Sequence, residues 1–277
     1  MNTTDIAPRL RLRHGSWNAL RSVIAGERVP RSELRELWDL NVLDGTALTD
    51  PAQELLEGLT GMAGVVHVLG SDAGALRSAS VWVAADGVGL LDQIDGDYTI
   101  LQRVERGIVP PSIVELLNLG PRPQLTEPES QTVPASLVNN VLEPSGDAAE
   151  PWTDLADAIE GSWPTISHAI DAGGWRCWLL QGHTVEDGTA KVRDTVCFLD
   201  TPDGLLDIVI DGETAALAPM TTMTLWRHLS HLISLASLRR SDPPPGPQRE
   251  RFAQRETLPG RNSPGWIHRV PLPVSSP

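Results

Sequence analysis

Apolar residues along this chain follow two spacings, and both spacings occur in the same order in each half. Short apolar runs separated by turn signals predict strands, and apolar residues three or four apart predict helices. In the first half we expect four strands, at 65–69, 80–84, 90–94 and 98–104, and then a helix reaching about Leu119. In the second half we expect four strands, at 175–180, 196–199, 205–210 and 214–217, and then a helix reaching about Leu238. The pattern therefore predicts an α+β fold.

Each set of strands is preceded by segments with a helical pattern. The first set follows helices predicted at 17–24 and 31–40, where Ser32 is a suitable N-cap, and a helix opened by Asp50-Pro51. The second set follows helices predicted at 152–160 and 163–170. Both halves thus share one plan, which is helices, then strands, then a closing helix.

Residues 81–119 and 196–235 match at an offset of 116 positions. Asp95-Gly96 falls on Asp211-Gly212, and the apolar residues of the strands and closing helices coincide. One Asp-Gly turn is a weak signal, but the shared order, spacing and helix register together indicate an internal duplication. One copy cannot bury enough surface alone, so two copies are expected to pack about a pseudo-two-fold axis. We predict two quasi-symmetric halves, each with antiparallel strands and helices.

The domain prediction is one domain over residues 1–238, followed by a tail. The first half covers about 15–119, a proline-rich linker with a short helix at 136–142 covers about 120–150, and the second half covers about 151–238. Residues 239–277 contain nine prolines and seven arginines and are expected to be disordered.

The 277 residues carry a net charge of −14 that is unevenly distributed. Residues 1–35 and residues 239–277 each have a net charge of +4, which leaves −22 on the middle of the chain. Such an acidic body repels nucleic acid and anionic membranes. No secretory signal or membrane-spanning apolar run is visible, and two cysteines cannot form a disulfide framework. We expect a cytoplasmic protein without membrane insertion.

Motifs of known enzymes are missing from the sequence. The single lysine, Lys191, is not part of a phosphate-binding loop, and no dinucleotide-binding or serine-hydrolase motif occurs. His228 and His231 are better interpreted as surface histidines than as metal ligands, and Cys177 and Cys197 as buried apolar residues. Asp92, Asp95 and Asp97 lack the pattern of a calcium loop and are interpreted as turn residues. We expect neither an enzyme nor a bound cofactor or metal.

Two stretches and the internal repeat resemble the EspG family, the cytosolic chaperones of type VII (ESX) secretion in actinobacteria. The stretches are "LRELWDLNVLDGTALTDPAQELLEGL", Leu34 to Leu59, and "FLDTPDGLLDIVIDGETAALAPMTTMTLWRHLSHLI", Phe198 to Ile233. The resemblance covers roughly residues 15–238. It implies a monomeric or weakly dimeric adaptor that binds the hydrophobic tip of a PE–PPE heterodimer and keeps it soluble for export.

Candidate contacts with such a partner lie on the predicted hairpins. Trp82 and Trp178 occur on strands of the two halves and are either core residues, the favoured role, or anchors on an open sheet face. The predicted hairpin tips add five polar candidates, which are Ser71, Asp72, His183, Glu186 and Asp187. Trp38 and Trp226 lie on helix stripes and are expected in the core.

Two other functions remain open at this stage. One is a small-molecule enzyme with its site between the halves, which a pocket rich in ionisable groups would favour. The other is regulation through nucleic acid bound by the basic ends of the chain.

Overall fold

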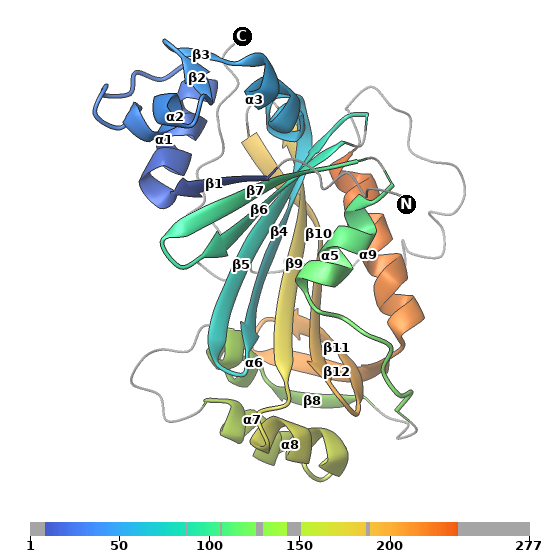
Figure 1. The fold of residues 1–277 in the computed structure, drawn as a ribbon. Helices are drawn as coiled ribbons and strands as arrows, with labels where there is room; N and C mark the ends of the chain where they lie inside the picture. The colour runs from blue at the N-terminus through green and yellow to red at the C-terminus, as the bar shows by residue number, and fades with distance from the viewer. Residues whose placement is uncertain are drawn as a thin grey trace, which may run out of the picture.

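The computed structural model describes residues 9–86, 88–105, 107–125, 130–142, 151–186 and 189–237. The regions expected to be a tail (239–277) and part of a linker (143–150) lie outside the described residues. One long antiparallel sheet runs through the molecule (Figure 1). Its strands stand in the order β1-β7-β6-β5-β4-β9-β10-β11-β12-β8. The α+β prediction with an antiparallel sheet is confirmed.

The strands of the first half and those of the second half meet at β4 and β9. β4 (Met62–Asp72) pairs with β9 (Arg176–Glu186), with His67 opposite Gln181. From this seam, β5 (Ala75–Ala84), β6 (Gly89–Asp95) and β7 (Tyr98–Val104) extend one way, and β10 (Thr189–Thr201), β11 (Gly204–Asp211) and β12 (Thr214–Met220) extend the other way. The order of the elements is therefore the same in both directions from the seam.

Two strands that the sequence pattern did not indicate close the ends of the sheet. β1 (Arg9–Arg13) pairs with β7, and β8 (Gln131–Pro134) pairs with β12. A separate small hairpin joins β2 (Leu43–Asp44) to β3 (Ala47–Leu48).

The front face of the sheet, to which Val66, Val68 and Leu180 point, is covered at its centre by two helices. These are α5 (Val109–Leu116) and α9 (Thr222–Ala236), the closing helices of the two halves (Figure 1). A Cβ on Gly64 would collide with the backbone of Ala236 in α9, so glycine at this position lets the helix lie directly on the strand. The front face thus holds one central apolar core.

The back face, to which Val65, His67 and Trp82 point, has two separate apolar cores, one at each end. One core lies under α1 (His14–Ile24), α2 (Arg35–Asp39), α3 (Asp50–Leu55) and α4 (Glu57–Thr60). The other lies under α6 (Ala135–Leu142), α7 (Pro151–Ile159) and α8 (Pro164–Asp171). Between them the central strands carry polar residues, among them His67, Gln181 and His183.

The turns after β6 and β11 show why their sequences agree. Gly96 and Gly212 adopt positive φ angles of 57° and 59°, in a region where glycine is favoured because it has no Cβ. Both glycines follow an aspartate at the end of a strand. The Asp-Gly pairs therefore mark equivalent hairpin turns in the two halves.

Several expectations are corrected by the strand lengths. The predicted loops at Ser71–Gly74 and His183–Lys191 are shorter than expected, because β4, β5, β9 and β10 all run further than their apolar runs. The predicted turn is found at Ala73 and Gly74, whereas Ser71, Asp72 and most of residues 183–191 belong to strands. Polar residues can occupy strands here since the middle of the back face is polar rather than apolar. Ser32 caps no helix, because α2 begins only at Arg35.

Candidate functional site

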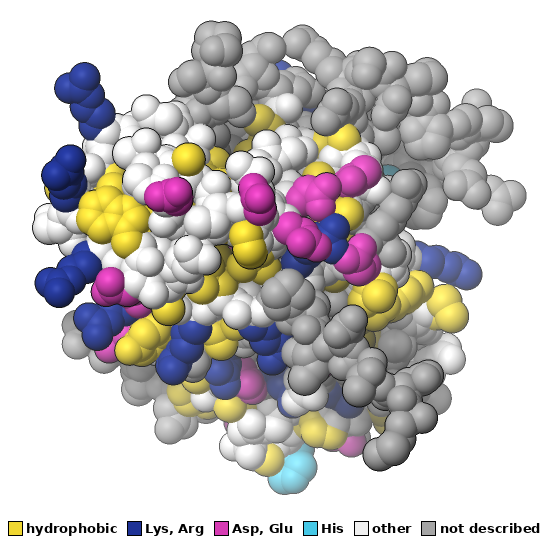
Figure 2. All heavy atoms as spheres, turned by 45° about the horizontal axis from the view of Figure 1, so that its top comes forward, with side chains coloured by type: hydrophobic (Ala, Val, Ile, Leu, Met, Phe, Trp, Pro, Cys, Tyr) yellow, Lys and Arg dark blue, Asp and Glu magenta, His cyan; other side chains and the backbone are white. Residues whose placement is uncertain are grey.

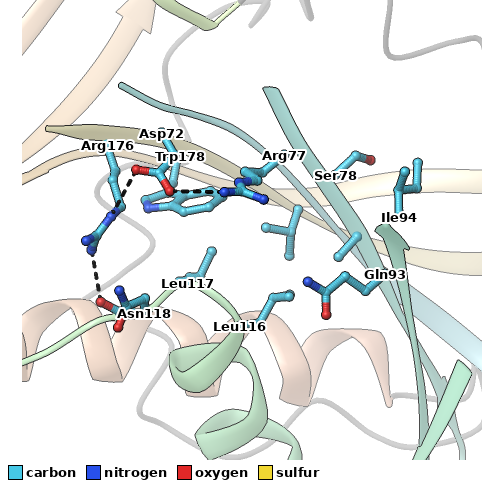
Figure 3. Close-up of a pocket in the computed structure, with 12 residues that line it drawn as sticks. Asp72, Arg77, Ser78, Gln93, Ile94, Leu116, Leu117, Asn118, Arg176 and Trp178 are labelled. Carbon is cyan, nitrogen blue, oxygen red and sulfur yellow. Dashed lines mark hydrogen bonds and ion pairs between the residues drawn. The ribbon is translucent and has the colours of Figure 1, made fainter. Parts of the chain in front are cut away.

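A cavity of about 210 Å³ lies on the front face, between the sheet and the C-terminal end of α5 (Figure 3). Both halves contribute to it across the seam. Its apolar lining comes from the sheet, with Val68, Ala79 and Trp178, and from Leu116 and Leu117 at the C-terminal end of α5. Such a cavity can take one apolar side chain or a small molecule.

Polar side chains surround this apolar lining. Asp72, Arg77 and Gln93 come from three neighbouring strands of the first half, and Asn118 follows α5. Arg176, the first residue of β9, completes the set from the second half. Apolar walls with a polar rim are typical of sites that bind another protein through a few anchoring residues.

A chain of ion pairs fixes the rim on the side of the second half. Asp72 Oδ1 lies 3.4 Å from Arg176 Nε, and Asp72 Oδ2 lies 3.6 Å from Arg77 (Figure 3). Arg176 also donates to the carbonyl of Asn118 at 3.0 Å and to Asp200 at 3.2 Å. These contacts tie β4, β9, β10 and the end of α5 together at one point.

Asp200 is the buried residue at the centre of this network of ion pairs. Its carboxylate is 1 % exposed and accepts hydrogen bonds from Arg122 Nε at 2.6 Å and Arg122 Nη2 at 3.1 Å. The hydrogen bond with Asp200 raises the pKa of Arg122. Because both oxygens of Asp200 are engaged by arginines, this carboxylate is structural, and Arg176 is held in place at the rim.

The two proposed tryptophan anchors are not exposed. The side chains of Trp82 and Trp178 are only 1 % and 3 % exposed, so both belong to the core, the role that the sequence favoured. Trp178 is a wall of the cavity, whereas Trp82 lies on the back face and donates from its indole to Asp92 at 3.0 Å. An anchor on an open sheet face needs exposed surface, which neither ring has.

The polar candidates are divided between the two faces. Asp72 lines the cavity, and Ser71, its neighbour on β4, is buried on the opposite face. His183 is not at a hairpin tip: it lies within β9 and is 6 % exposed. Glu186 ends β9, and Asp187 lies outside the described residues. Only Asp72 and Trp178 of the predicted set are therefore brought together.

A second group of polar side chains is buried on the back face, beside the seam. The rings of His67 and His183 lie edge to face, 4.9 Å apart, and His67 Nδ1 is 3.1 Å from the hydroxyl of Ser80. Burial, with His183 and Arg21 nearby, lowers the pKa of His67 from 6.5 to about 3. Burial also lowers the pKa of His183. Both rings are neutral at physiological pH.

Asp92 lies next to these histidines and corrects the expectation of a turn residue. It is buried within β6, where Trp82 Nε1 and the Ser80 amide donate to its carboxylate. Burial raises the pKa of Asp92, while these hydrogen bonds and Arg21 act in the opposite direction. The strand predicted at 90–94 already contained this position, so the strand is confirmed and only the interpretation of Asp92 as a turn residue is wrong.

Exposed apolar side chains occur near the cavity and elsewhere. Leu76 at the start of β5 is 58 % exposed, and Ile94, which borders the cavity near the end of β6 but points its side chain to the back face (Figure 3), is 52 % exposed. Trp226 on α9 is 39 % exposed, so its expected place in the core is wrong. Trp38 packs against the core beneath α1–α4 and is partly buried.

The described residues contain little that suggests catalysis. Within them, no three His, Cys, Asp or Glu side chains are grouped so as to hold a metal ion. Cys177 and Cys197 are both buried free thiols, and their mutual contact together with burial raises the pKa of Cys197. Among the helices that the structure describes, none combines the length and apolar character needed to cross a bilayer.

Sequence reasoning missed Arg77, Gln93, Asn118 and Arg176, which form most of the rim. They are single polar residues at strand and helix ends, where polar residues are common, and only the tertiary fold brings them together. Asn118 has a positive φ of 50°, as residues following a helix often do.

Comparisons with known proteins give one finding, which concerns the fold. No protein-family model matches the sequence, and no curated protein matches it. Among solved structures, the chain is similar to the Mycobacterium tuberculosis type VII secretion system chaperone EspG5, solved in complex with a PE25–PPE41 dimer. The two share 8 % sequence identity with a TM-score of 0.50, over 85 % of this chain and 98 % of that chain. This chain thus has a fold similar to that of a type VII secretion chaperone.

Proposed function

We propose that this protein is a cytoplasmic, non-enzymatic chaperone or adaptor of type VII secretion, which binds the hydrophobic helical tip of PE/PPE-like proteins and keeps them soluble for export. The observation that carries the proposal is the similarity of fold to EspG5 over nearly the whole of that chain. An apolar helical tip exposed to water would aggregate, so a partner that covers it reversibly is needed.

The front-face cavity is the proposed docking point for the tip. An apolar side chain from the tip would enter between Trp178 and α5, while Asp72, Arg77 and Gln93 contact polar groups around it. A small apolar centre with a polar rim suits a complex that must be released again at the secretion machinery.

The symmetry of the fold belongs to the same proposal. We interpret the matching element order on both sides of the β4–β9 seam as an internal duplication about a pseudo-two-fold axis, within one domain over residues 1–238. The cavity lies across the seam, so both copies build one binding platform. We expect the protein itself to be a monomer or a weak homodimer that binds no nucleic acid.

The test is co-expression with whichever PE/PPE-like pairs the genome of the source organism encodes. We expect the full chain to keep such a pair soluble and to co-purify with it in a defined stoichiometry during size-exclusion chromatography. If every such pair stays insoluble or elutes without the chain, the chaperone proposal is wrong.

A matched pair of variants tests the docking point separately. Leu116→Asp places a charge at the cavity, whereas Val114→Asp changes another partly buried residue of α5 that does not line it. We expect Leu116→Asp to weaken cargo binding by about tenfold more than Val114→Asp does, since interface anchors typically contribute at least about 1.4 kcal/mol. Equal effects of the two variants would move the docking point elsewhere while leaving the function intact.

A small-molecule enzyme with a site between the halves is the second candidate. The observation in its favour is that the cavity does span both halves and has Asp72, Arg77 and Arg176 at its rim. Native mass spectrometry of the purified chain addresses this candidate, because a retained small molecule lost on Ala79→Phe would place a ligand in the cavity.

A further inference from the structure

The register of the central strands explains why the front face has a cavity. Gly70 of β4 lies opposite both Arg77 of β5 and Trp178 of β9. The next row on the same face pairs Val68 with Ala79. A Cβ on Gly70 would collide with the ring of Trp178. The sheet therefore forms a floor of small residues, with an indole ring on one side and a guanidinium group on the other.

Arg77 is the donor at the rim that is least engaged by the protein itself. Asp72 is the one carboxylate among the described residues that line the cavity, and Arg176 and Arg77 both pair with it, at 3.4 Å and 3.6 Å. Arg176 donates to further acceptors, whereas this long ion pair is the one polar contact of Arg77 within the described part of the chain. The side chain of Arg77 is also 59 % exposed, so its N–H groups can reach a partner.

Two more donors lie around the same space. The indole Nε1 of Trp178 is buried and has no hydrogen-bond partner among the described residues. Figure 3 shows this nitrogen on the side of the ring that faces Arg176 and Asn118. Gln93 brings a side-chain amide to the cavity from β6. A buried donor without an acceptor is costly, so an occupant that brings acceptor atoms is favoured.

The charge at the cavity differs from that of the protein as a whole. Residues 36–238 carry a net charge of −22. Figure 2 shows Lys and Arg side chains along the left and lower left of one face, and a group of Asp and Glu side chains to the right of its centre, so the two signs are separated over this surface. The lining of the cavity has two arginines and one aspartate. Groups with partial negative charge are therefore favoured there.

The two ends of a helix differ in these same properties. The last turn of a helix leaves four backbone carbonyls without partners and carries a partial negative charge. The first turn leaves four N–H groups without partners and carries a partial positive charge. A rim of donors with an excess of arginine complements the last turn and opposes the first.

We propose that the cavity receives the C-terminal end of a cargo helix. An apolar side chain from the last turn enters between Trp178 and Leu116, and the free carbonyls of that turn accept hydrogen bonds from Arg77 and Gln93. This inference rests on the proposed chaperone function and adds which end of the cargo helix docks. An apolar side chain alone would fill the cavity but leave the donors of the rim without acceptors.

The probes are alanine-based helical peptides of about 20 residues, uncharged at both ends and labelled with a dye at the end far from a single leucine. One peptide has its leucine in the last turn, and a second peptide of the same composition has it in the first turn. A third peptide repeats the last-turn sequence with glycine in place of the central alanines, so that it does not form a helix. The set separates the helix end from the apolar side chain.

Fluorescence anisotropy with the full chain measures the three affinities. The last-turn peptide should bind at least about tenfold more tightly than either other peptide, as two hydrogen bonds to the rim imply. Leu116→Asp should abolish this preference, and Val114→Asp, at a residue of α5 outside the cavity, should keep it. A preference that persists in Leu116→Asp would place the peptide elsewhere and overturn the proposal.

Arg77→Met tests the donors of the rim. The side chain of Arg77 is largely exposed, so its replacement should leave the fold intact. We expect the last-turn peptide to bind Arg77→Met about fivefold more weakly than the wild type, and the first-turn peptide to be unaffected. Arg31→Met changes an exposed arginine that does not line the cavity and should bind as the wild type does.

Each remaining outcome decides against the proposal. Equal binding of the first-turn and last-turn peptides would mean that the cavity recognises only an apolar side chain, and equal binding of the glycine peptide would mean that no helix end is needed. Absence of binding by every peptide at about 1 mM protein would exclude docking of a helix end. Cargo could still co-purify with the chain in all three cases, so failure of this inference is distinct from failure of the chaperone proposal.

Discussion

The buried pair His67 and His183 should make the stability of this protein fall as the pH is lowered. His67 is neutral in the fold, where its pKa is lowered to about 3, and it titrates near 6.5 when the chain unfolds. Between these values the unfolded state binds a proton that the folded state does not, so acid favours unfolding. For His67 alone, stability is fully present above pH 6.5, declines as the pH falls below it, and stops declining near pH 3.

The size of this effect follows from the two pKa values. Their full difference corresponds to about 5 kcal/mol, and about 2 kcal/mol of it is lost between about pH 7 and about pH 5. His67→Gln removes the titrating ring and retains a polar side chain beside Ser80. We expect the free energy of unfolding of the wild type to fall by about 2 kcal/mol more than that of His67→Gln over this range.

Urea unfolding followed by tryptophan fluorescence at several pH values measures this difference. Carboxylates that titrate in both proteins contribute equally to both curves of unfolding free energy against pH. The comparison therefore uses the difference between the two slopes, which does not depend on how the variant changes stability at neutral pH. His168→Gln, which changes an exposed histidine of α8, is the control and should keep the wild-type slope. Identical slopes for His67→Gln and the wild type would refute the argument that burial keeps this ring neutral.

Two further predictions concern the cavity and its supporting ion pairs. Asp200→Asn leaves Arg122 and Arg176 without their buried carboxylate and should lower the free energy of unfolding by about 3 kcal/mol in urea titrations. Gly70→Ala adds a Cβ that collides with the ring of Trp178, and overpacking of this kind should lower the stability by about 2 kcal/mol, seen as a lower melting temperature.

Matched substitutions test whether the lost buried carboxylate and the added Cβ cause these two losses of stability. Asp203→Asn changes an exposed aspartate near Asp200 and should leave stability nearly unchanged. Gly15→Ala adds a Cβ with open space around it on helix α1, where alanine is favoured over glycine, and should stabilise slightly. A stable Gly70→Ala protein would mean that Trp178 can move, and the cavity beside it would then be adjustable.

The internal pattern of the chain made much of the sheet predictable. The strand at 98–104 is found at those residues, and the predicted strands at 90–94 and 205–210 lie within β6 and β11. These strands have apolar residues bounded by Asp-Gly turns, so local sequence determines both their existence and their ends. The closing helices were predictable for the same reason, because α5 and α9 carry a continuous apolar stripe against the front core.

The central strands were predicted too short, because their polar residues are not at the surface. β9 continues through Gln181 and His183, both buried, and β4 continues through Ser71. Prediction from apolar runs assigns the polar residues at the end of a run to a loop. Here these residues lie within strands, in the middle of a sheet that helices cover at both ends. Burial of this kind depends on tertiary packing and is invisible in the local sequence.

The cavity and the end strand β1 also differ in how much of them the local sequence predicts. The cavity joins residues separated by more than 100 positions, and its rim residues have no pattern of their own. The edge at β1 is the opposite case, since the alternation from Arg9 to Arg13 is complete in five residues. That alternation indicates a strand with one charged face and one apolar face, whatever its position in a sheet. The strand order, which the local sequence does not contain, places this strand at one end of the sheet, beside β7.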